Sequence, residues 1–321
     1  MHHDEPAPPS AHENQPLIVL VGPTGSGKTT LAVRLAEQLA GEIVSCDSVA
    51  VYREMEIGTA KPTTEERALI PHHGLDVVNP DQPFTAGDWS RLAREALVGI
   101  SARGRLPIIA GGTGLYLRAL LDGLFPAPPI DPTLRARLRG LAARKGAAAL
   151  HRLLRRLDPR AAATIHTNDV PKAVRAVEVS LAAHQPLTEQ WAAGRDALTG
   201  YRVLRLGLAA PRQRLYDRIN RRAAAMFDRG LVAETSLLVD RFGFDCRPLG
   251  SLGYAEAVGV LRRDLTTAQA VAQAQQGHRN YAKRQGTWFR KDAAIHWLEG
   301  FGDEPEILAA AMAEIQPHLL A

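Results

Sequence analysis

A glycine-rich segment near the amino terminus combines the residue types and the spacing of a phosphate-binding loop. Its sequence, Gly22-Pro23-Thr24-Gly25-Ser26-Gly27-Lys28-Thr29, satisfies the pattern G-x-x-x-x-G-K-[ST]. Glycines in such a loop let backbone N–H groups face anionic oxygens, the lysine adds a positive charge, and the last hydroxyl can bind Mg²⁺. We therefore predict that all eight residues bind a polyphosphate and that Thr29 offers its hydroxyl to Mg²⁺.

The segments on either side of this loop fit that interpretation better than a chance glycine-rich turn. The apolar run Leu17–Val21 precedes the loop as a buried strand would, and a helical apolar face follows at Leu31, Val33, Leu35 and Leu39. The phosphate would then lie at a helix amino terminus, where unpaired N–H groups and the helix dipole favour anions.

A carboxylate follows the next predicted strand. Ile43–Val44 lead into Ser45-Cys46-Asp47-Ser48, so we expect Asp47 at the carboxyl end of a sheet, where α/β proteins bind ligands. There it could hold Mg²⁺ or deprotonate a hydroxyl in a kinase, or take a proton from an amine nucleophile in another group transfer. A helix N-cap is the structural alternative for this aspartate.

A second glycine turn follows the third predicted strand. The run Leu106–Ala110 leads into Gly111-Gly112-Thr113-Gly114-Leu115-Tyr116, which opens a helix at the same edge of the sheet. Thr113 would then reach the reacting centre. A glycine turn before a helix is common, however, so this signal is weak by itself.

The carboxyl-terminal segment His278–Lys291 interleaves lysines and arginines with Tyr281, Trp288 and Phe289. Cations neutralise phosphates while aromatic rings stack on unpaired bases, so this mixture suits RNA. An amphipathic helix that buries Trp288 and Phe289 is an equally ordinary interpretation of the same segment.

The elements that must position these residues show an α/β pattern. Apolar runs bounded by turn residues alternate with helical patterns, which is typical of a parallel sheet. These runs are Leu17–Val21, Ile43–Val44, Leu106–Ala110, Val203–Leu208 and Ala294–Leu298. We predict a P-loop NTPase-like parallel sheet flanked by helices, two of which span Pro211–Gly230 and Thr266–Arg290.

A long segment rich in Ala, Leu and Arg separates the third and fourth predicted strands. Its helical periodicity predicts an inserted all-helical domain at residues 122–201, between core segments at 16–121 and 202–321, with the proline-rich Phe125–Pro132 as a hinge. Residues 1–15 are rich in Pro, His and acidic groups and are expected to form a disordered leader.

The composition is that of a globular protein of two units, with 321 residues, 45% of them hydrophobic and 23% charged. No stretch approaches the about 18 apolar residues that span a membrane, and the leader is too polar for a signal peptide. We therefore expect a cytoplasmic protein without a membrane partner. Cys46 and Cys246 are too few for a disulfide framework or a paired-cysteine zinc site.

The charge is distributed unevenly along the chain. Between Asp131 and Arg222 there are 19 Lys and Arg against 7 Asp and Glu, so the rest of the chain carries a net charge of −7 although the total is +5. Such a basic block suggests a polyanionic partner, nucleic acid above all. Solvated Ala/Arg-rich helices with nothing to bind are an equally good alternative on charge alone.

Taken together, the motifs resemble the tRNA dimethylallyltransferase family over about Leu17–Leu298. The segments that carry the resemblance are Gly22–Thr29, Asp47-Ser48 with Tyr52, Ile57–Pro62, Pro71-His72-His73, Gly111–Tyr116, and Lys283-Arg284-Gln285 with Thr287-Trp288-Phe289-Arg290. The resemblance implies that the dimethylallyl group of dimethylallyl diphosphate moves to N6 of adenine 37 of tRNA, next to the anticodon, and that pyrophosphate leaves.

The resemblance also implies roles for individual residues. Asp47 would be the base that orients the adenine amine and accepts its proton, and Thr113 would lie near the bridging oxygen or the amine. Lys28, the loop amides and the implied cofactor Mg²⁺ would stabilise charge on the departing pyrophosphate. Arg218 resembles the arginine that clamps the diphosphate.

The same resemblance implies that the target adenine is flipped out of its stack and that the basic insertion grips the anticodon stem-loop. The residues expected to contact tRNA are Asp47, Ser48, Val49, Ala50, Thr113, Arg135, Pro171, Lys172, Ala173, Val174, Arg175, Ser251, Leu252, Gly253, Tyr254, Lys283, Arg284, Gln285, Thr287, Trp288 and Arg290. Two positions depart from the family pattern. Ala50 stands where many relatives carry Gln, and Gly286 replaces a usually bulkier residue.

Three other functions share parts of this pattern. A P-loop small-molecule kinase would need ATP and a phosphate acceptor. A transferase that prenylates free adenine nucleotides would share the loop and Asp47, but the basic insertion and Lys283–Arg290 distinguish the chain from it. A non-catalytic RNA-binding NTPase would leave Asp47 without a role. We expect the protein to be a monomer.

Overall fold

The computed structural model of the chain describes residues 14–125, 128, 131–192 and 196–320. The chain divides into two compact units, of which one is formed by residues 121–198 and the other by the segments before and after it. The expected leader falls largely outside the described residues, except that Gln15 is the first residue of a strand.

The larger unit contains a six-stranded parallel sheet in the order β3-β2-β4-β1-β5-β6. Its strands are β1 (Gln15–Val21), β2 (Gly41–Cys46), β3 (His72–His73), β4 (Leu106–Gly111), β5 (Tyr201–Leu208) and β6 (Ile295–Leu298). The predicted α/β fold is confirmed, and each predicted apolar run forms a strand. The sequence did not reveal β3, because a pair of histidines has no apolar run to mark it.

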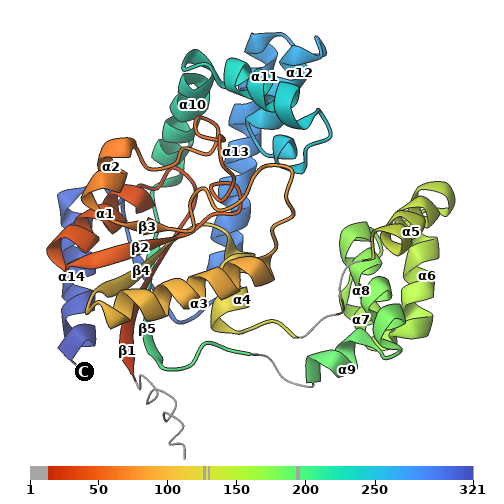
Figure 1. The fold of residues 1–321 in the computed structure, drawn as a ribbon, viewed down its shortest axis with the longest axis horizontal. Helices are drawn as coiled ribbons and strands as arrows, with labels where there is room; N and C mark the ends of the chain where they lie inside the picture. Colours follow the sequence, from red (N-terminus) through yellow and green to blue (C-terminus); the bar gives the residue numbers. More distant parts are fainter. Residues whose placement is uncertain (1–13, 126–127, 129–130, 193–195, 321) are drawn as a thin grey trace, which may run out of the picture. The chain divides into compact units, whose positions relative to one another are not determined.

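Helices cover both faces of this sheet, which is why its central strands are continuous apolar runs. On one face, α1 (Lys28–Gln38) and α14 (Pro305–Leu320) pack against Ile18, Leu20 and Ile108. Figure 1 shows α1 and α14 side by side. The other face is covered by α3 (Ala86–Ala102), and Ser90 of α3 donates a hydrogen bond to Ala119 of α4 (Gly114–Leu121). The short α2 (Thr64–Leu69) precedes β3.

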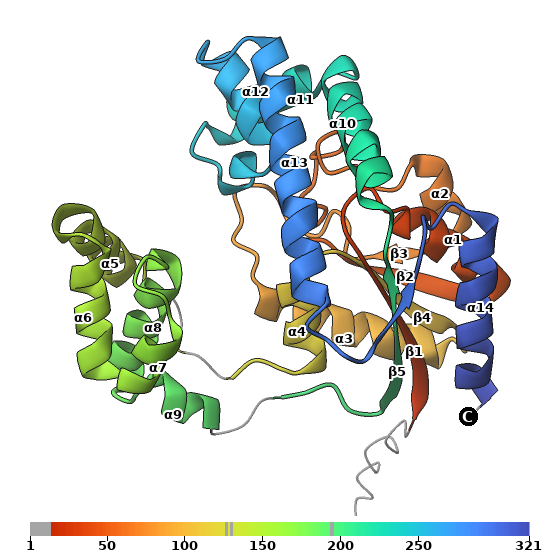
Figure 2. The same cartoon turned by 180° about the vertical axis from the view of Figure 1, so that it is seen from behind.

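The carboxyl-terminal helices gather beyond the carboxyl ends of the strands (Figures 1 and 2). They are α10 (Arg212–Asp228), α11 (Leu231–Phe242), the 3₁₀ turn Arg247–Gly250, α12 (Tyr254–Leu261) and α13 (Thr267–Phe289). The long α13 begins at a capping box between Thr266 and Gln269 and packs along α10. These helices therefore lie over the edge where the predicted active-site loops emerge.

The smaller unit contains α5 (Pro132–Lys145), α6 (Ala147–Leu157), α7 (Pro159–Thr164), α8 (Val170–Ala183) and α9 (Leu187–Ala192), and its described residues form no strand. Leu138, Leu150 and Val177 are buried in its core. Asp131, Asp158 and Asp169 cap three of the helices just before a first-turn proline, which fixes where these helices begin.

The boundaries of this unit differ from the expected 122–201. The compact unit ends at Leu198, and Tyr201 is already the first residue of β5, paired with Gln15. The polar and glycine-rich exit hid this boundary, because the strand begins with Tyr201 and Arg202, ahead of its apolar residues. Among the described residues no helix is long and apolar enough to cross a membrane.

Candidate active site

The phosphate-binding loop connects β1 to α1, as the sequence predicts. Gly25 and Gly27 have φ angles of 81° and 86°, a region that favours glycine. A Cβ at Gly27 would also lie 2.8 Å from the backbone nitrogen of Gly302, whose N–H donates to the Ser26 carbonyl. These contacts hold the loop against the turn after β6 and keep it at the amino terminus of α1.

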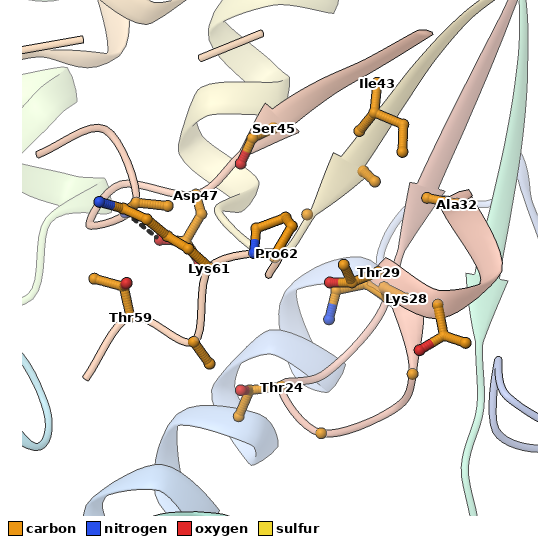
Figure 3. A pocket seen from close by; sticks show the side chains of 18 of the residues that line it. Thr24, Lys28, Thr29, Ala32, Ile43, Ser45, Asp47, Thr59, Lys61 and Pro62 are labelled. Atoms are coloured by element: carbon orange, nitrogen blue, oxygen red, sulfur yellow. Dashed lines mark hydrogen bonds between the residues drawn. The ribbon is translucent and has the colours of Figure 1, made fainter. Parts of the chain in front are cut away.

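The loop forms one wall of a cavity of about 480 Å³ at the carboxyl edge of the sheet. Figure 3 shows Lys28 and Thr29 at the start of α1, with Asp47 and Thr59 across the cavity from them. The structure thus brings the predicted phosphate loop and the predicted base to one cavity.

Lys28 lines this cavity and is half-buried. Its Nζ donates a hydrogen bond of 2.8 Å to the carbonyl of Pro23. Burial, reinforced by the positive charge of Arg222, lowers the pKa of Lys28 from 10.5 to about 7. An anion beside Lys28 would raise this pKa again and keep the ammonium charged, so the site favours a bound anion.

Two arginines from α10 also line the cavity, and they have different partners. Arg222 is half-buried and donates to the hydroxyl of Thr24 in the phosphate loop, and its burial lowers its pKa. Arg218 forms an ion pair of 2.6 Å with Asp303 and stacks over Phe301.

Sequence reasoning chose Arg218 and missed Arg222. The helical period was the signal that could have found it, because Arg222 lies one turn after Arg218 on the same face of α10. Arg222 is the arginine that contacts the loop in this structure, whereas Asp303 already engages Arg218.

Asp47 and Thr113 lie on two loops that are hydrogen-bonded to each other. Asp47 Oδ1 accepts from the N–H groups of Val49 at 2.8 Å and Ala50 at 3.2 Å, which closes a turn, so this aspartate is not a helix N-cap. Thr113 Oγ1 accepts from the N–H of Ser48 at 3.1 Å. A Cβ at Gly111 would lie 2.1 Å from the Cys46 carbonyl, so the close approach of the two loops requires glycine there.

Two side chains of α13 complete this region. Gln285 accepts from the N–H of Thr24 at 2.8 Å and donates to the Gly112 carbonyl at 2.9 Å, so it connects the phosphate loop to the Thr113 loop. Gln285 is only 6% exposed and lines the cavity, so its expected contact with tRNA stays a prediction. Tyr281 lines the cavity, and burial together with the charge of Asp47 raises its pKa to about 12.

The wall opposite the phosphate loop is the segment Thr59–Pro62. Lys61 is 1% exposed and donates to the Tyr52 carbonyl at 2.7 Å and to Asp76 and Glu56 at 2.6 and 2.9 Å. A buried cation with three acceptors fixes the segment on which it lies. Lys61 therefore acts as an anchor of the cavity wall.

A second anchor of this wall comes from α11. Glu234 accepts hydrogen bonds from the N–H of Ile57 at 2.9 Å and from the hydroxyl of Tyr254 at 2.6 Å. A Cβ at Gly58 would lie 2.4 Å from the Tyr254 ring, so the segment packs directly on that ring. Sequence reasoning missed Glu234. No local pattern marks it, because its partners are 20 and 177 residues away.

The residues expected to contact tRNA fall into exposed and buried groups. Lys283, Arg284, Thr287 and Trp288 of α13 are exposed, as is Arg290 immediately after the helix. In the smaller unit Pro171 and Lys172 are exposed. Tyr254, Ala173 and Val174 are buried, so their side chains support these segments from inside. Gly253 is also buried, and Ala50 is buried but lines the candidate active-site cavity. Arg135 and Arg175 both pair with the buried carboxylate of Glu178. Ser48, Val49, Ser251 and Leu252 are partly buried.

Comparison with known proteins finds two family models that match this chain. The family model described as IPP transferase matches residues 50–292, and the model described as isopentenyl transferase matches residues 15–70. A crystal structure of the full-length tRNA isopentenylpyrophosphate transferase of Bacillus halodurans is 36% identical, with a TM-score of 0.72 over 96% of this chain and 97% of that chain. A eukaryotic dimethylallyltransferase acting on tRNA, 24% identical with a TM-score of 0.76, shares the fold over 94% of this chain and 79% of that chain.

Two curated relatives are more similar in sequence. The tRNA dimethylallyltransferase of Koribacter versatilis is 59% identical over 94% of this chain and 98% of the relative. That of Solibacter usitatus is 52% identical over 95% of this chain and 99% of the relative. With the phosphate loop and Asp47 in one cavity, the chain belongs to the tRNA dimethylallyltransferase family.

Proposed function

We propose that the protein transfers the dimethylallyl group of dimethylallyl diphosphate to N6 of adenine 37 of tRNA. The observation that carries this proposal is that a phosphate loop and a carboxylate, Asp47, face one cavity from opposite sides. A donor diphosphate on the loop would direct its reactive carbon toward Asp47. An adenine amine entering from the Asp47 side would then meet that carbon.

The cations of the cavity suit a departing pyrophosphate. Negative charge builds on the leaving group as its bond to carbon breaks, and Lys28 and Arg222 line the cavity and are hydrogen-bonded to the phosphate loop, so they would lie beside that charge. Such preorganised donors in a buried site stabilise a transition state more than they would in water. Arg218 lines the same cavity and adds positive charge beside the loop.

The oxygen ligands of the site fit Mg²⁺. Thr29 and Asp47 both line the cavity, and among the described residues no group of three or more His, Cys, Asp and Glu could cage a metal by itself. This sparse oxygen set suits an ion that keeps its waters and binds mainly through substrate phosphates. We propose that Thr29 contacts Mg²⁺ in this way, and that bound Mg²⁺ adds charge neutralisation at the pyrophosphate.

Asp47 is suited to the proton transfer. Its Oδ1 is held by two backbone N–H groups, and Oδ2 makes no hydrogen bond to any residue that the structure describes. The exocyclic amine of adenine is a poor nucleophile, because its lone pair is delocalised into the ring. A hydrogen bond to Oδ2 would orient the amine, and the carboxylate would accept its proton as the new bond forms. Thr113, fixed on Ser48, would position the amine or the bridging oxygen.

The partner of this site is proposed to be the anticodon stem-loop of tRNA, with adenine 37 flipped into the cavity. The exposed cations and Trp288 on α13 support a single-stranded RNA next to the cavity. We further propose that the protein acts as a monomer in the cytoplasm. The family match favours tRNA over a kinase substrate, a free nucleotide or a non-catalytic RNA-binding NTPase.

The experiment that tests this function is nucleoside analysis by mass spectrometry. Unmodified tRNA with adenine at position 37 is incubated with the protein, Mg²⁺ and dimethylallyl diphosphate, with AMP as a parallel acceptor. We expect N6-dimethylallyladenosine in the tRNA and none on AMP. Modified AMP without modified tRNA would establish the free-nucleotide transferase instead, and no product on either acceptor would defeat the proposal.

Replacing the proposed base separates chemistry from binding. Asp47→Ala should retain RNA binding and lose at least about 10²-fold in kcat, the usual contribution of a general base. Asp81→Ala, which removes an exposed carboxylate outside the cavity lining, is the matched control. Normal turnover by Asp47→Ala would exclude Asp47 as the base.

A further inference from the structure

A second carboxylate lines the candidate active site and takes no part in the steps proposed above. Of the described residues around this cavity, Asp47 and Asp303 carry carboxylates. Asp303 lies directly against the phosphate loop, because a Cβ at Gly27 would lie 3.0 Å from its Oδ1. A carboxylate in this position repels a bound phosphate. Asp303 therefore opposes the ligand that the loop is built to bind.

The backbone holds Asp303 in this position. The N–H of Gly302 donates to the Ser26 carbonyl at 2.9 Å, and Arg34 donates to the backbone carbonyl of Asp303 at 3.2 Å. A Cβ at Gly302 would lie 2.3 Å from the Gly27 carbonyl oxygen, so the two backbones are in close contact. The backbone of Asp303 cannot move away from an arriving phosphate without breaking these contacts.

Arg218 is the counter-ion of Asp303. Its Nη1 donates to Asp303 Oδ1 at 2.6 Å, and this hydrogen bond lowers the pKa of Asp303, so the carboxylate stays ionised. The guanidinium also lies over the buried ring of Phe301, with its Cζ 3.8 Å from the ring centroid. The other N–H groups of Arg218 make no hydrogen bond to any described residue. They can therefore reach a phosphate in the cavity that Arg218 lines.

Arg218 thus has two anionic partners, Asp303 and a diphosphate on the loop. While Asp303 engages Arg218, the diphosphate meets an ion pair instead of an isolated cation, and Lys28 and Arg222 supply the remaining positive charge. Cations that stabilise a departing pyrophosphate also retain it after the reaction, and product release limits turnover in many enzymes. A competing carboxylate beside the loop reduces this retention.

We propose that Asp303 is a positioning residue that competes with pyrophosphate for Arg218 and so speeds the release of this product. The proposal rests on the proposed function, because pyrophosphate is a product only if the dimethylallyl group is transferred. The sign of the effect distinguishes competition from a structural role. A residue that only held Arg218 in place for the ligand would strengthen pyrophosphate binding, whereas a competitor weakens it.

The test measures pyrophosphate affinity by calorimetry in the presence of Mg²⁺. Asp303→Asn keeps an oxygen that accepts from Arg218 but removes the negative charge. The Arg218 and Asp303 side chains are 30% and 41% exposed, so solvent screens the pair, and we expect Asp303→Asn to bind pyrophosphate about tenfold more tightly. Asp303→Glu restores the charge and should bind within about twofold of the wild type. Equal or weaker binding by Asp303→Asn would overturn the proposal.

A neighbouring ion pair supplies the matched control. Glu304 and Arg214 form an ion pair of 2.9 Å between the same two segments, and Arg214 also lies over the Phe301 ring. Neither residue of this pair lines the cavity. Glu304→Gln should therefore leave pyrophosphate affinity within about twofold of the wild type. If it tightens binding as much as Asp303→Asn does, overall charge explains the effect and the role of Asp303 is refuted.

Two further measurements connect the effect to release and to Arg218. Dissociation of radiolabelled pyrophosphate into excess unlabelled ligand should be about tenfold slower for Asp303→Asn, and an unchanged dissociation rate would refute the effect on release. In an Arg218→Gln background, Asp303→Asn should tighten binding by less than it does when Arg218 is present. An equal gain in both backgrounds would show that the carboxylate does not act through Arg218.

Failure of this proposal can be distinguished from failure of the proposed function. If the wild-type protein makes no dimethylallyladenosine while Asp303→Asn still binds pyrophosphate more tightly, the proposed function fails and the competition at Arg218 stands. If tRNA is modified and Asp303→Asn binds pyrophosphate no more tightly than the wild type, the function stands and the role of Asp303 is overturned.

Discussion

At the scale of single residues, the lowered pKa of Lys28 makes the charge of the site depend on pH. Its folded-state pKa of about 7 lies below the ordinary 10.5, so the unfolded lysine keeps a proton that the folded one loses between these values. Stability of the ligand-free protein should therefore rise with pH from about 7 toward 10.5. A bound diphosphate raises this pKa again. We therefore predict that pyrophosphate binding at pH 8 is accompanied by the uptake of at most about one proton by Lys28.

Calorimetry in buffers of different ionisation enthalpy measures this uptake. Pyrophosphate itself titrates in this range, so the comparison is with Lys28→Arg, whose guanidinium stays charged throughout. Wild-type protein should take up more protons than Lys28→Arg. Equal uptake by the two proteins would show that Lys28 is already fully protonated before the ligand binds.

At the scale of elements, the cavity wall depends on α11 and α12 as much as on its own loop. Glu234→Ala removes the acceptor for the Ile57 N–H and the Tyr254 hydroxyl, and leaves both donors without a partner. We predict a loss of about 2 kcal/mol in the free energy of unfolding, from the cost of unpaired buried donors. The KM for dimethylallyl diphosphate should rise as well, because Thr59–Pro62 would lose one anchor.

Tyr254→Phe is the matched variant at this scale. It removes a single hydrogen bond and keeps the ring that packs on Gly58, so it should lose only about 1 kcal/mol. Urea unfolding and steady-state kinetics on the same preparations provide both readouts. A Glu234→Ala protein as stable as the wild type would show that this contact does not fix the wall.

At the scale of the whole molecule, the positive charge is concentrated in the smaller unit. Within the described part of the chain its exposed arginines Arg152, Arg155, Arg156 and Arg160 form no ion pair. We predict that replacing these four with Gln raises the KM for tRNA, flattens its salt dependence, and leaves kcat within about twofold, because phosphate contacts hold the RNA without touching the reacting atoms.

The measurement is the tRNA KM at several salt concentrations. The charge-matched control replaces Arg53, Arg91, Arg241 and Arg263, four exposed arginines of the larger unit, with Gln. If both fourfold variants show the same change, net charge explains the effect and the smaller unit has no special role in tRNA binding.

The sequence by itself determined the elements and the motifs. Apolar runs and helical periods depend on neighbouring residues, so they predicted the parallel sheet and the helical insertion, and the phosphate loop and Asp47 were visible for the same reason. Only the tertiary structure decided which side chains complete the site. Gln285 and Arg222 are hydrogen-bonded to Thr24, from which they are 261 and 198 residues away in sequence. Glu234 is hydrogen-bonded to Ile57, 177 residues away. Such contacts arise when distant helices pack on the same sheet edge, and no local pattern encodes them.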